Sequence, residues 1–310
     1  MLYRLEKLIK SMLSIIVCSR NKTLSKELIN NIINTIGVDY EIITIDNSEN
    51  QHSISSAYNL GVTKSKYQYI CFVHEDVYFH SSNWGNKVIA HLQNPNIGII
   101  GLAGAGTVTR VPAAWSGLLS KSEFIIQSDR TGKKVTEIFH IPLNYNQSER
   151  SVVILDGVFM CMRRELMQKI HFDEKLNGFH GYDFDISMQS TINGYVNNVI
   201  YDIKIEHFSR GKTDKAYYRN LITVFKKWES YLPVFLNNSQ EVMHSENSIN
   251  EDYNLHRLIK KMIREGFKLN EIIEEAYYYA DITGYKKVVV NLKIRIFLIR
   301  LFNCPKYLFK

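Results

Sequence analysis

Tyr69–Asp76 reads YICFVHED, a short apolar run that stops abruptly at charged residues. The run Tyr69–Val73 is continuous, so it predicts a strand that is buried on both faces, as the strands of parallel sheets are. His74-Glu75-Asp76 then ends the strand, although these three residues together are a poor turn signal. Polar side chains that end a buried strand in this way favour a functional role at this position.

The same pattern recurs on both sides of this strand. Leu13–Cys18 and Glu41–Ile45 are buried-strand runs, and Ile97–Leu102 is a further strand. Between the strands, apolar residues recur at helical spacing over residues 24–36, 54–62 and 84–92. Strands that alternate with helices predict βαβ units with right-handed crossovers. The expected fold class is therefore α/β, with a mostly parallel, Rossmann-like sheet flanked by helices.

Polar clusters follow three of these strands. They are Ser19-Arg20-Asn21, Asp46-Asn47-Ser48 and His74-Glu75-Asp76. A single cluster is more simply explained as a turn, because strands often end in Asp, Asn and Ser. The coincidence of three is informative because ligands of such sheets bind at the carboxyl ends of the strands. We therefore predict a binding site at this edge of the sheet.

The rest of the first 236 residues holds a long insertion and a second group of elements. Residues 104–150 contain glycine and proline with little periodicity, so we expect a partly mobile insertion near the site. A helix is expected to start near Asp183 and another to cover residues 217–231. Further strands are expected at residues 152–155, 158–162, 195–201 and 203–208.

The chain beyond this domain differs in composition. We assign residues 1–236 to one domain and the polar segment 237–254 to a linker. Residues 255–310 are expected to form a basic, helical C-terminal extension, with helices at 255–264 and 271–280.

The net charge of +7 is concentrated at the C-terminal end. Seven lysines and arginines and no acids follow Asp281, and apolar residues are interleaved with them. Such a segment suits an anionic partner, so we expect residues 285–310 to contact an anionic membrane surface, and a solubilising tail is the simpler alternative. Nucleic-acid binding would rest on this tail alone, so we expect no nucleic acid partner.

The cysteines and the apolar runs indicate the cellular compartment of the protein. None of the four cysteines is spaced as CxxC, and Cys18, Cys71 and Cys161 lie in strand-like runs. This pattern predicts small buried thiols in a reducing compartment, with no disulfides or zinc ligands. No apolar run reaches the roughly 20 residues that a transmembrane helix needs. We expect a cytoplasmic protein, peripheral at the inner face of the cell membrane.

The acids after the third strand indicate a metal site. Glu75 and Asp76 supply carboxylate oxygens, the ligands that hard cations prefer. His207, after a later strand, completes a set that suits manganese better than calcium. Taken alone, His207 is more often a hydrogen-bonded histidine, so its assignment depends on the surrounding motif. A divalent metal at this edge would neutralise a bound diphosphate.

These motifs resemble the family 2 glycosyltransferases of the GT-A fold, and most closely the glycosyltransferase-like bacterial proteins of surface polysaccharide synthesis. Ser14–Arg20 is similar to the first strand and donor-binding loop of that family. Asp46 matches the aspartate that contacts the nucleobase, and Ala57–Gly61 matches an Asn-x-Gly helix segment. His74-Glu75-Asp76 takes the place of the DxD metal motif, with His74 where the first acid is usual.

The resemblance continues in the same order to Gly211. Asp156-Gly157 and Arg163-Arg164 match an Asp-Gly before a strand that ends in Arg-Arg. Tyr182–Asp185 matches the Glu-Asp-x-Asp of the family, with Tyr182 in place of the glutamate. His207–Gly211 matches a histidine before a Ser-x-Gly turn. Each motif alone is weak, and their common order makes the signal specific.

The resemblance implies a role for each matching residue. Asp183 falls on the catalytic aspartate and is the expected base, with a helix N-cap as the structural alternative. Asp76 and His207 are expected to bind Mn²⁺ or Mg²⁺. The expected donor-binding residues are Ser19, Arg20, Asp46, Asn59, His74, Glu75 and Asp156. Rings that suit sugar stacking add Trp115, His180 and Tyr182 as expected acceptor-binding residues.

We therefore expect an inverting glycosyltransferase that moves a sugar from a nucleotide-sugar, a UDP-sugar first, to a glycan or lipid-linked acceptor. Bacterial surface polysaccharide or glycoconjugate synthesis is the expected context. A nucleotidyltransferase or nucleotide-sugar hydrolase is one alternative, but it would show a glycine-rich phosphate loop, and residues 18–22 contain no glycine. A catalytically silent nucleotide- or glycan-binding module is the other, although Asp76 and Asp183 are both present.

Overall fold

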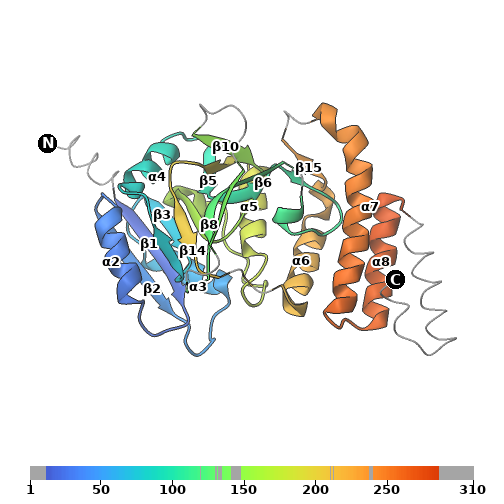
Figure 1. The fold of residues 1–310 in the computed structure, drawn as a ribbon, viewed down its shortest axis with the longest axis horizontal. Helices are drawn as coiled ribbons and strands as arrows, with labels where there is room; N and C mark the ends of the chain where they lie inside the picture. Colours follow the sequence, from blue (N-terminus) through green and yellow to red (C-terminus); the bar gives the residue numbers. More distant parts are fainter. Residues whose placement is uncertain are drawn as a thin grey trace. The chain divides into compact units, whose positions relative to one another are not determined.

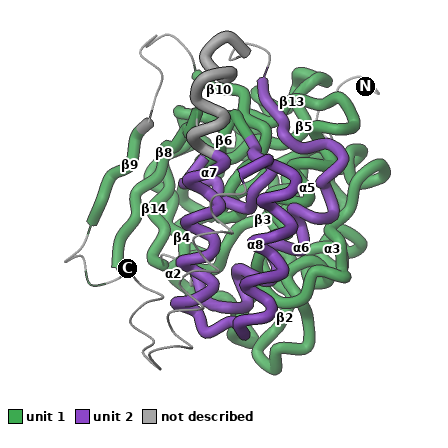
Figure 2. The backbone as a smooth tube through the Cα atoms, turned by 90° about the vertical axis from the view of Figure 1, so that its right-hand side faces the viewer, with its two compact units in different colours: residues 1–107, 119–211 green, residues 108–118, 212–310 purple. Residues whose placement is uncertain are grey.

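The computed structural model describes residues 12–118, 120–129, 131, 135–140, 148–209, 211, 213–236 and 240–285. The chain divides into two compact units, which Figure 2 shows in green and purple. The first comprises residues 1–107 and 119–211, and the second comprises residues 108–118 and 212–310.

The first unit is built on a seven-stranded sheet (Figure 1). In spatial order the strands are β10 (Glu149–Val152), β13 (Val196–Ile200), β5 (Ile97–Gly101), β12 (Phe159–Arg163), β3 (Tyr69–Val73), β1 (Leu13–Ser19) and β2 (Tyr40–Asp46). β1 pairs in parallel with both β2 and β3. β12 and β10 run antiparallel to their neighbours, and the other strands share one direction. The predicted mostly parallel α/β sheet is confirmed.

Helices cover both faces of this sheet. They are α2 (Lys26–Thr35), α3 (Ile54–Lys64), α4 (Trp84–Leu92) and α5 (Tyr182–Ile192), and a short 3₁₀ helix, η2 (Arg164–Gln168), follows β12. Successive residues of a strand point to opposite faces. Ile15 accordingly shares one apolar core with Leu28 of α2 and Trp84 of α4, whereas Ile16 shares the other with Tyr58 of α3. The continuous apolar run of β1 is therefore buried on both sides.

A second sheet lies in the same unit. Its strands run in the order β11 (Ile154–Leu155), β6 (Ala103–Ala105), β8 (Lys121–Gln127), β14 (Ile205–His207) and β4 (Val77–Phe79), and β9 (Thr136–His140) pairs with β8. The expected insertion over residues 104–150 therefore contains regular strands, which its sequence does not predict. β8 buries the polar Ser122 and Glu123, so its sequence lacks the apolar alternation that reveals a strand.

The second unit is mainly helical. Its elements are η1 (Trp115–Gly117), α6 (Lys215–Lys227), η3 (Glu229–Tyr231), α7 (Gln240–Arg264) and α8 (Leu269–Thr283), and β15 (Val234–Phe235) pairs with β7 (Thr107–Val108). Residues 240–254, which we expected in a linker, form the first part of α7. Buried polar contacts hold this part: the Glu251 carboxylate accepts the backbone N–H groups of Arg110 and Val111 at 2.6 and 2.9 Å. Hydrophobic periodicity does not report such contacts.

The cysteines also differ from expectation. Cys71 of β3 and Cys161 of β12 are cross-strand neighbours and form a disulfide. The prediction of free thiols is wrong for this pair, because the sequence does not show that β12 lies antiparallel beside β3. Cys18 is free and half-buried. The cysteines therefore give no argument for a reducing compartment.

Among the described residues, none of the helices combines the length and the apolar character needed to cross a bilayer. The basic segment from residue 286 to 310 lies outside the described residues, so its contact with an anionic membrane surface stays a prediction.

One histidine of the first unit is held between two carboxylates. His91 of α4 contacts Glu149 through Nδ1 at 2.7 Å and Asp202 through Nε2 at 3.1 Å. Burial alone would lower the pKa of His91, but the hydrogen bonds to Asp202 and Glu149 raise it from 6.5 to about 9. The folded state therefore favours the imidazolium. Its contribution to stability is complete below about pH 6.5 and is lost as the pH rises through about 9.

We predict that His91→Gln lowers the melting temperature at about pH 6 and that the difference from the wild type closes above about pH 9. Stability is lost because the carboxylates of Glu149 and Asp202 no longer face a cation. A shift of about 2–4 °C is expected for each kcal/mol lost. Thermal unfolding of both proteins across this pH range measures the difference. A difference in melting temperature that stays constant with pH would contradict the ion pairs of His91 with Glu149 and Asp202.

Candidate active site

The polar clusters at the ends of β1 and β3 meet at one edge of the sheet. The Ser19 hydroxyl donates to the Glu75 carboxylate at 2.6 Å. The backbone N–H of Arg20 donates to the same carboxylate at 3.2 and 3.3 Å. The structure thus brings together Ser19, Arg20 and Glu75, as parallel strand ends require. Glu75 is engaged in fixing the loop after β1, and the Arg20 guanidinium stays exposed above the Phe179 ring.

Asp46 lies at the end of β2, directly opposite Ser19 in the parallel register. Its carboxylate accepts the backbone N–H of Ser48 at 2.9 Å. These hydrogen bonds from Ser48 lower the pKa of Asp46, so the group is ionised at neutral pH. The half-buried, anionic Asp46 carboxylate therefore lies beside the loop that follows β1 and can accept a hydrogen bond there.

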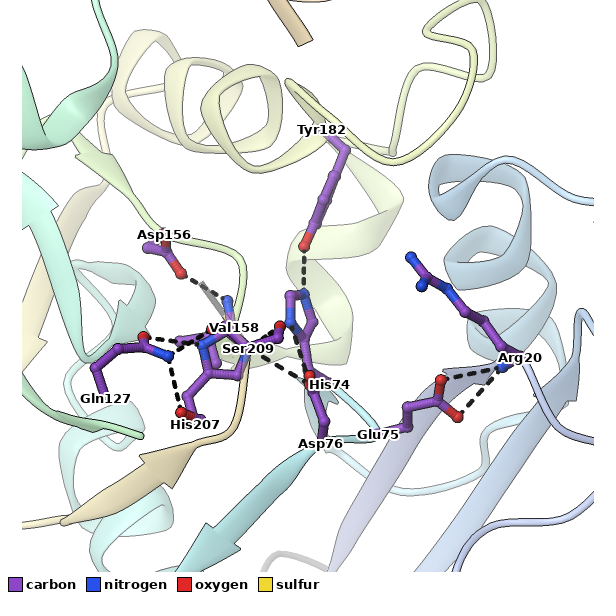
Figure 3. A network of polar contacts seen from close by, with 10 residues as sticks. All are labelled: Arg20, His74, Glu75, Asp76, Gln127, Asp156, Val158, Tyr182, His207 and Ser209. Atoms are coloured by element: carbon purple, nitrogen blue, oxygen red, sulfur yellow. Dashed lines mark hydrogen bonds and ion pairs between the residues drawn. The ribbon is translucent and has the colours of Figure 1, made fainter. Parts of the chain in front are cut away.

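A candidate metal centre lies next to these residues (Figure 3). His74 and Asp76 follow β3, and His207 ends β14. His207 Nε2 is 3.4 Å from an Asp76 oxygen, and His74 Nδ1 is 4.0 Å from it. One ligand atom from each of the three residues lies within 4.8 Å of the others. Two imidazole nitrogens and a carboxylate oxygen fit a divalent transition metal such as Mn²⁺.

The protonation states of this cluster suit metal binding. Burial alone would raise the pKa of Asp76, but hydrogen bonding and charge from His207 hold it below its usual range. Burial, with the charge of His207 as a second cause, lowers the pKa of His74. A metal ligand must be an ionised carboxylate or a neutral imidazole. Asp76 and His74 meet this condition at neutral pH.

Asp183 stands in the first turn of α5. Its carboxylate accepts the backbone N–H groups of Gly157 at 3.2 Å and Phe184 at 2.9 Å. Burial and the negative charge of Asp156 raise the pKa of Asp183 to about 7. A carboxylate with this pKa can accept a proton at neutral pH. Gly181 occupies the N-cap position, so the alternative of Asp183 as the N-cap residue does not hold.

Tyr182 is placed differently from the expected acceptor-binding role. Its side chain is only 4% exposed, and its ring packs against Tyr58 and Phe172. Its hydroxyl lies 2.9 Å from His74 Nε2. The close packing requires Gly157, because a Cβ there would meet the Tyr182 hydroxyl at 2.0 Å. The ring face is therefore unavailable for sugar stacking, and the hydroxyl contacts His74 of the candidate metal centre.

Asp156, His180 and Trp115 were also predicted to be site residues. The Asp156 carboxylate accepts the backbone N–H of Val158 at 3.0 Å, and its negative charge raises the pKa of Asp183. His180 is half-buried in the loop before α5. Trp115 opens η1 in the second unit, so its acceptor role stays a prediction.

Gln127 is a site residue that the sequence did not reveal. It ends β8, which runs parallel to β14 and places Gln127 beside His207. Its amide nitrogen donates to the carbonyl oxygens of His207 and Ser209, at 2.8 and 2.5 Å. Its amide oxygen faces His207 Nδ1 at 3.3 Å. Gln127 lies within residues 104–150, where no motif marks it.

Asn59, an expected donor-binding residue, makes hydrogen bonds to the segment before α5. Its amide nitrogen donates to the Phe172 carbonyl at 2.9 Å and to the Glu174 carboxylate at 2.8 Å. Its amide oxygen accepts the N–H of Phe172 at 3.2 Å. Asn59 therefore ties α3 to the segment before α5.

We predict that Asn59→Ala mainly destabilises the fold. Three hydrogen bonds are lost, so the free energy of unfolding should fall by roughly 1–3 kcal/mol. Urea unfolding measures the loss, and Thr63→Ala, on the same helix, is the matched control because it removes one exposed hydroxyl. Unchanged stability together with weaker nucleotide binding would instead support a donor-binding role for Asn59.

The central sheet, with helices on both of its faces, has the GT-A fold. The chain belongs to the glycosyltransferase-like family, whose model matches residues 14–237. A search of curated proteins finds no match to this sequence.

Two solved structures are similar to this chain. GalNAc-T7, solved with UDP, GalNAc and Mn²⁺, is 14% identical with a TM-score of 0.50, and the match covers 88% of this chain. The match spans only 57% of the GalNAc-T7 chain. The mannosyltransferase PcManGT from Pyrobaculum calidifontis, solved with GDP-Man and Mn²⁺, is 12% identical with a TM-score of 0.49, covering 91% of this chain and 86% of that one. At these identities the first likeness shows the fold alone.

Proposed function

We propose that the protein is an inverting, divalent-metal-dependent glycosyltransferase. It takes a sugar from a nucleotide-sugar donor, with a UDP-sugar as the first candidate, and transfers it to an acceptor hydroxyl. The observation that carries this proposal is the proximity of two groups. Tyr182 joins the cluster of His74, Asp76 and His207 through its hydroxyl, and the next residue is Asp183, whose pKa lies near 7.

The donor end of the proposed site is built from the strand ends. A divalent ion held by Asp76 and His207 would neutralise the diphosphate of the leaving nucleotide. Arg20 adds an exposed cation beside the Ser19–Glu75 contact. The ionised Asp46 suits the N3–H of a uracil ring, which supports a UDP-sugar.

Asp183 supplies the base of the proposed reaction. In a single displacement, the acceptor oxygen bonds to the anomeric carbon while the bond from that carbon to the nucleotide diphosphate breaks. Asp183 takes the proton that leaves the acceptor oxygen. The backbone N–H groups of Gly157 and Phe184 hold its carboxylate in place. Attack from the face opposite the leaving group inverts the anomeric configuration.

The acceptor and the cellular context are part of the proposal. Family membership and the basic segment 285–310 support a glycan or lipid-linked acceptor in bacterial surface polysaccharide or glycoconjugate synthesis. Seven cations interleaved with apolar residues would hold the enzyme at an anionic, cytoplasmic membrane face.

We predict that Asp183→Asn lowers kcat by about 10²–10⁴-fold, because an amide cannot take a proton at neutral pH. The melting temperature and donor affinity should change little, since the amide oxygen still accepts a backbone N–H. Asp185→Asn makes the same substitution two residues further along α5 and should lose much less activity. Steady-state transfer assays compare the two variants. Near-normal kcat in Asp183→Asn would place the base elsewhere.

We predict that donor binding requires a divalent metal. A UDP-sugar should raise the melting temperature in Mn²⁺, by the equivalent of about 2.7 kcal/mol at 100 times its Kd, and should have no effect in EDTA. Asp76→Ala should abolish the shift, and Asp39→Ala, an exposed acid at the amino end of β2, should retain it. An equal shift in EDTA would contradict metal dependence.

A further inference from the structure

The two histidines of the metal cluster present different ring nitrogens to Asp76. His74 faces Asp76 with Nδ1, whereas His207 faces it with Nε2 (Figure 3). The other nitrogen of each ring has its own partner. His74 Nε2 lies 2.9 Å from the Tyr182 hydroxyl, and His207 Nδ1 lies 3.3 Å from the amide oxygen of Gln127. Each ring is therefore held from the side opposite Asp76.

The orientation of the Gln127 amide determines the tautomer of His207. Its nitrogen donates to two carbonyl oxygens, those of His207 and Ser209, so the other amide atom must be the oxygen. An amide oxygen only accepts, which requires a proton on His207 Nδ1. His207 Nε2 lies 3.4 Å from an Asp76 oxygen, so in the neutral ring with its proton on Nδ1 the Nε2 lone pair is available to a metal ion that Asp76 also binds. The Ser209 hydroxyl contacts the same Nε2 atom at 3.3 Å, a contact that a metal ion would replace.

Tyr182 acts in the same way on the other ring. Its hydroxyl is buried and reaches Nε2, where it can accept the N–H of neutral His74. The Nδ1 lone pair of His74 then faces Asp76. A histidine that binds a metal usually donates its second N–H to a neighbouring acceptor, and this contact fixes the ring. Tyr182 and Gln127 occupy the positions of such acceptors.

We infer that Tyr182 and Gln127 are positioning residues that hold His74 and His207 in opposite tautomers. His74 Nδ1, an Asp76 oxygen and His207 Nε2 thereby form a preformed three-ligand site, which binds Mn²⁺ before the nucleotide and discriminates against Mg²⁺. The inference rests on the metal-dependent function proposed above and makes His74 a ligand in addition to Asp76 and His207.

The chemistry of the ligands gives the selectivity. Mg²⁺ prefers oxygen ligands and keeps several waters, whereas imidazole nitrogens suit first-row transition metals. A histidine at position 74, where the related motif carries an acid, replaces an oxygen ligand with a nitrogen. The Tyr182 and Gln127 contacts remove the need to reorient either ring when the ion arrives.

Binding of Mn²⁺ to the nucleotide-free protein, followed by electron paramagnetic resonance of the free ion, tests the inference. The wild type should bind Mn²⁺ and release little of it to excess Mg²⁺. Tyr182→Phe should weaken binding by about 10–100-fold, the usual effect of losing an outer partner. His74→Ala should weaken it too, and His74→Asp should shift the preference towards Mg²⁺. Tyr69→Phe removes the hydroxyl of another buried tyrosine, at the opposite end of β3, and should bind as the wild type does.

The outcomes separate this inference from the proposed function. If Asp76→Ala loses Mn²⁺ while His74→Ala and Tyr182→Phe bind it normally, the metal site stands and the inference is overturned. If Asp76→Ala also binds normally, the metal site of the proposed function fails. A wild type that binds no Mn²⁺ without nucleotide overturns the preformed site.

A second readout reports the tautomers directly. Nitrogen chemical shifts of the Zn²⁺-loaded protein should show His74 bound through Nδ1 and His207 through Nε2. Binding of both rings through the same type of nitrogen would overturn the assignment, even if the affinities agreed.

Discussion

The pairing of β14 with β4 is the contact on which the candidate site depends. It sets His207 opposite Val77, and the N–H of Phe208 donates to the carbonyl of Asp76 at 3.0 Å. His207 therefore meets Asp76 although the two residues lie in distant parts of the sequence. β8 extends the same sheet and brings Gln127 beside His207. Without this second sheet, the strand end at Asp76 would carry a carboxylate and one histidine.

The strand ends of the central sheet could be predicted because they follow from local pattern and general topology. Short, continuous apolar runs identify β1, β2 and β3, and parallel packing then requires their carboxyl ends to share an edge. The contact of Ser19 and Arg20 with Glu75 is the direct consequence. The start of α5 near Asp183 could also be predicted, because a glycine-containing loop precedes it.

The remaining features depend on contacts between distant residues that carry no local signal. β8 buries polar side chains, so neither the strand nor Gln127 is visible in the periodicity. The first part of α7 is polar and is held through Glu251, so it resembles a linker. Tyr182 was predicted to stack on a sugar because only the structure shows that its ring is packed against Tyr58. The Cys71–Cys161 bond depends on which strand lies beside β3.

In the proposed site, a metal-binding cluster and a proton acceptor lie at one edge of the sheet and are linked through Tyr182. The most direct measurement is a crystal structure of the protein with Mn²⁺ and UDP, with anomalous scattering recorded at the manganese edge. We expect one strong anomalous peak within bonding distance of His74 Nδ1, Asp76 and His207 Nε2, with the diphosphate on its open side. A peak at another location, or a bound diphosphate without manganese beside Asp76, would contradict the proposed site.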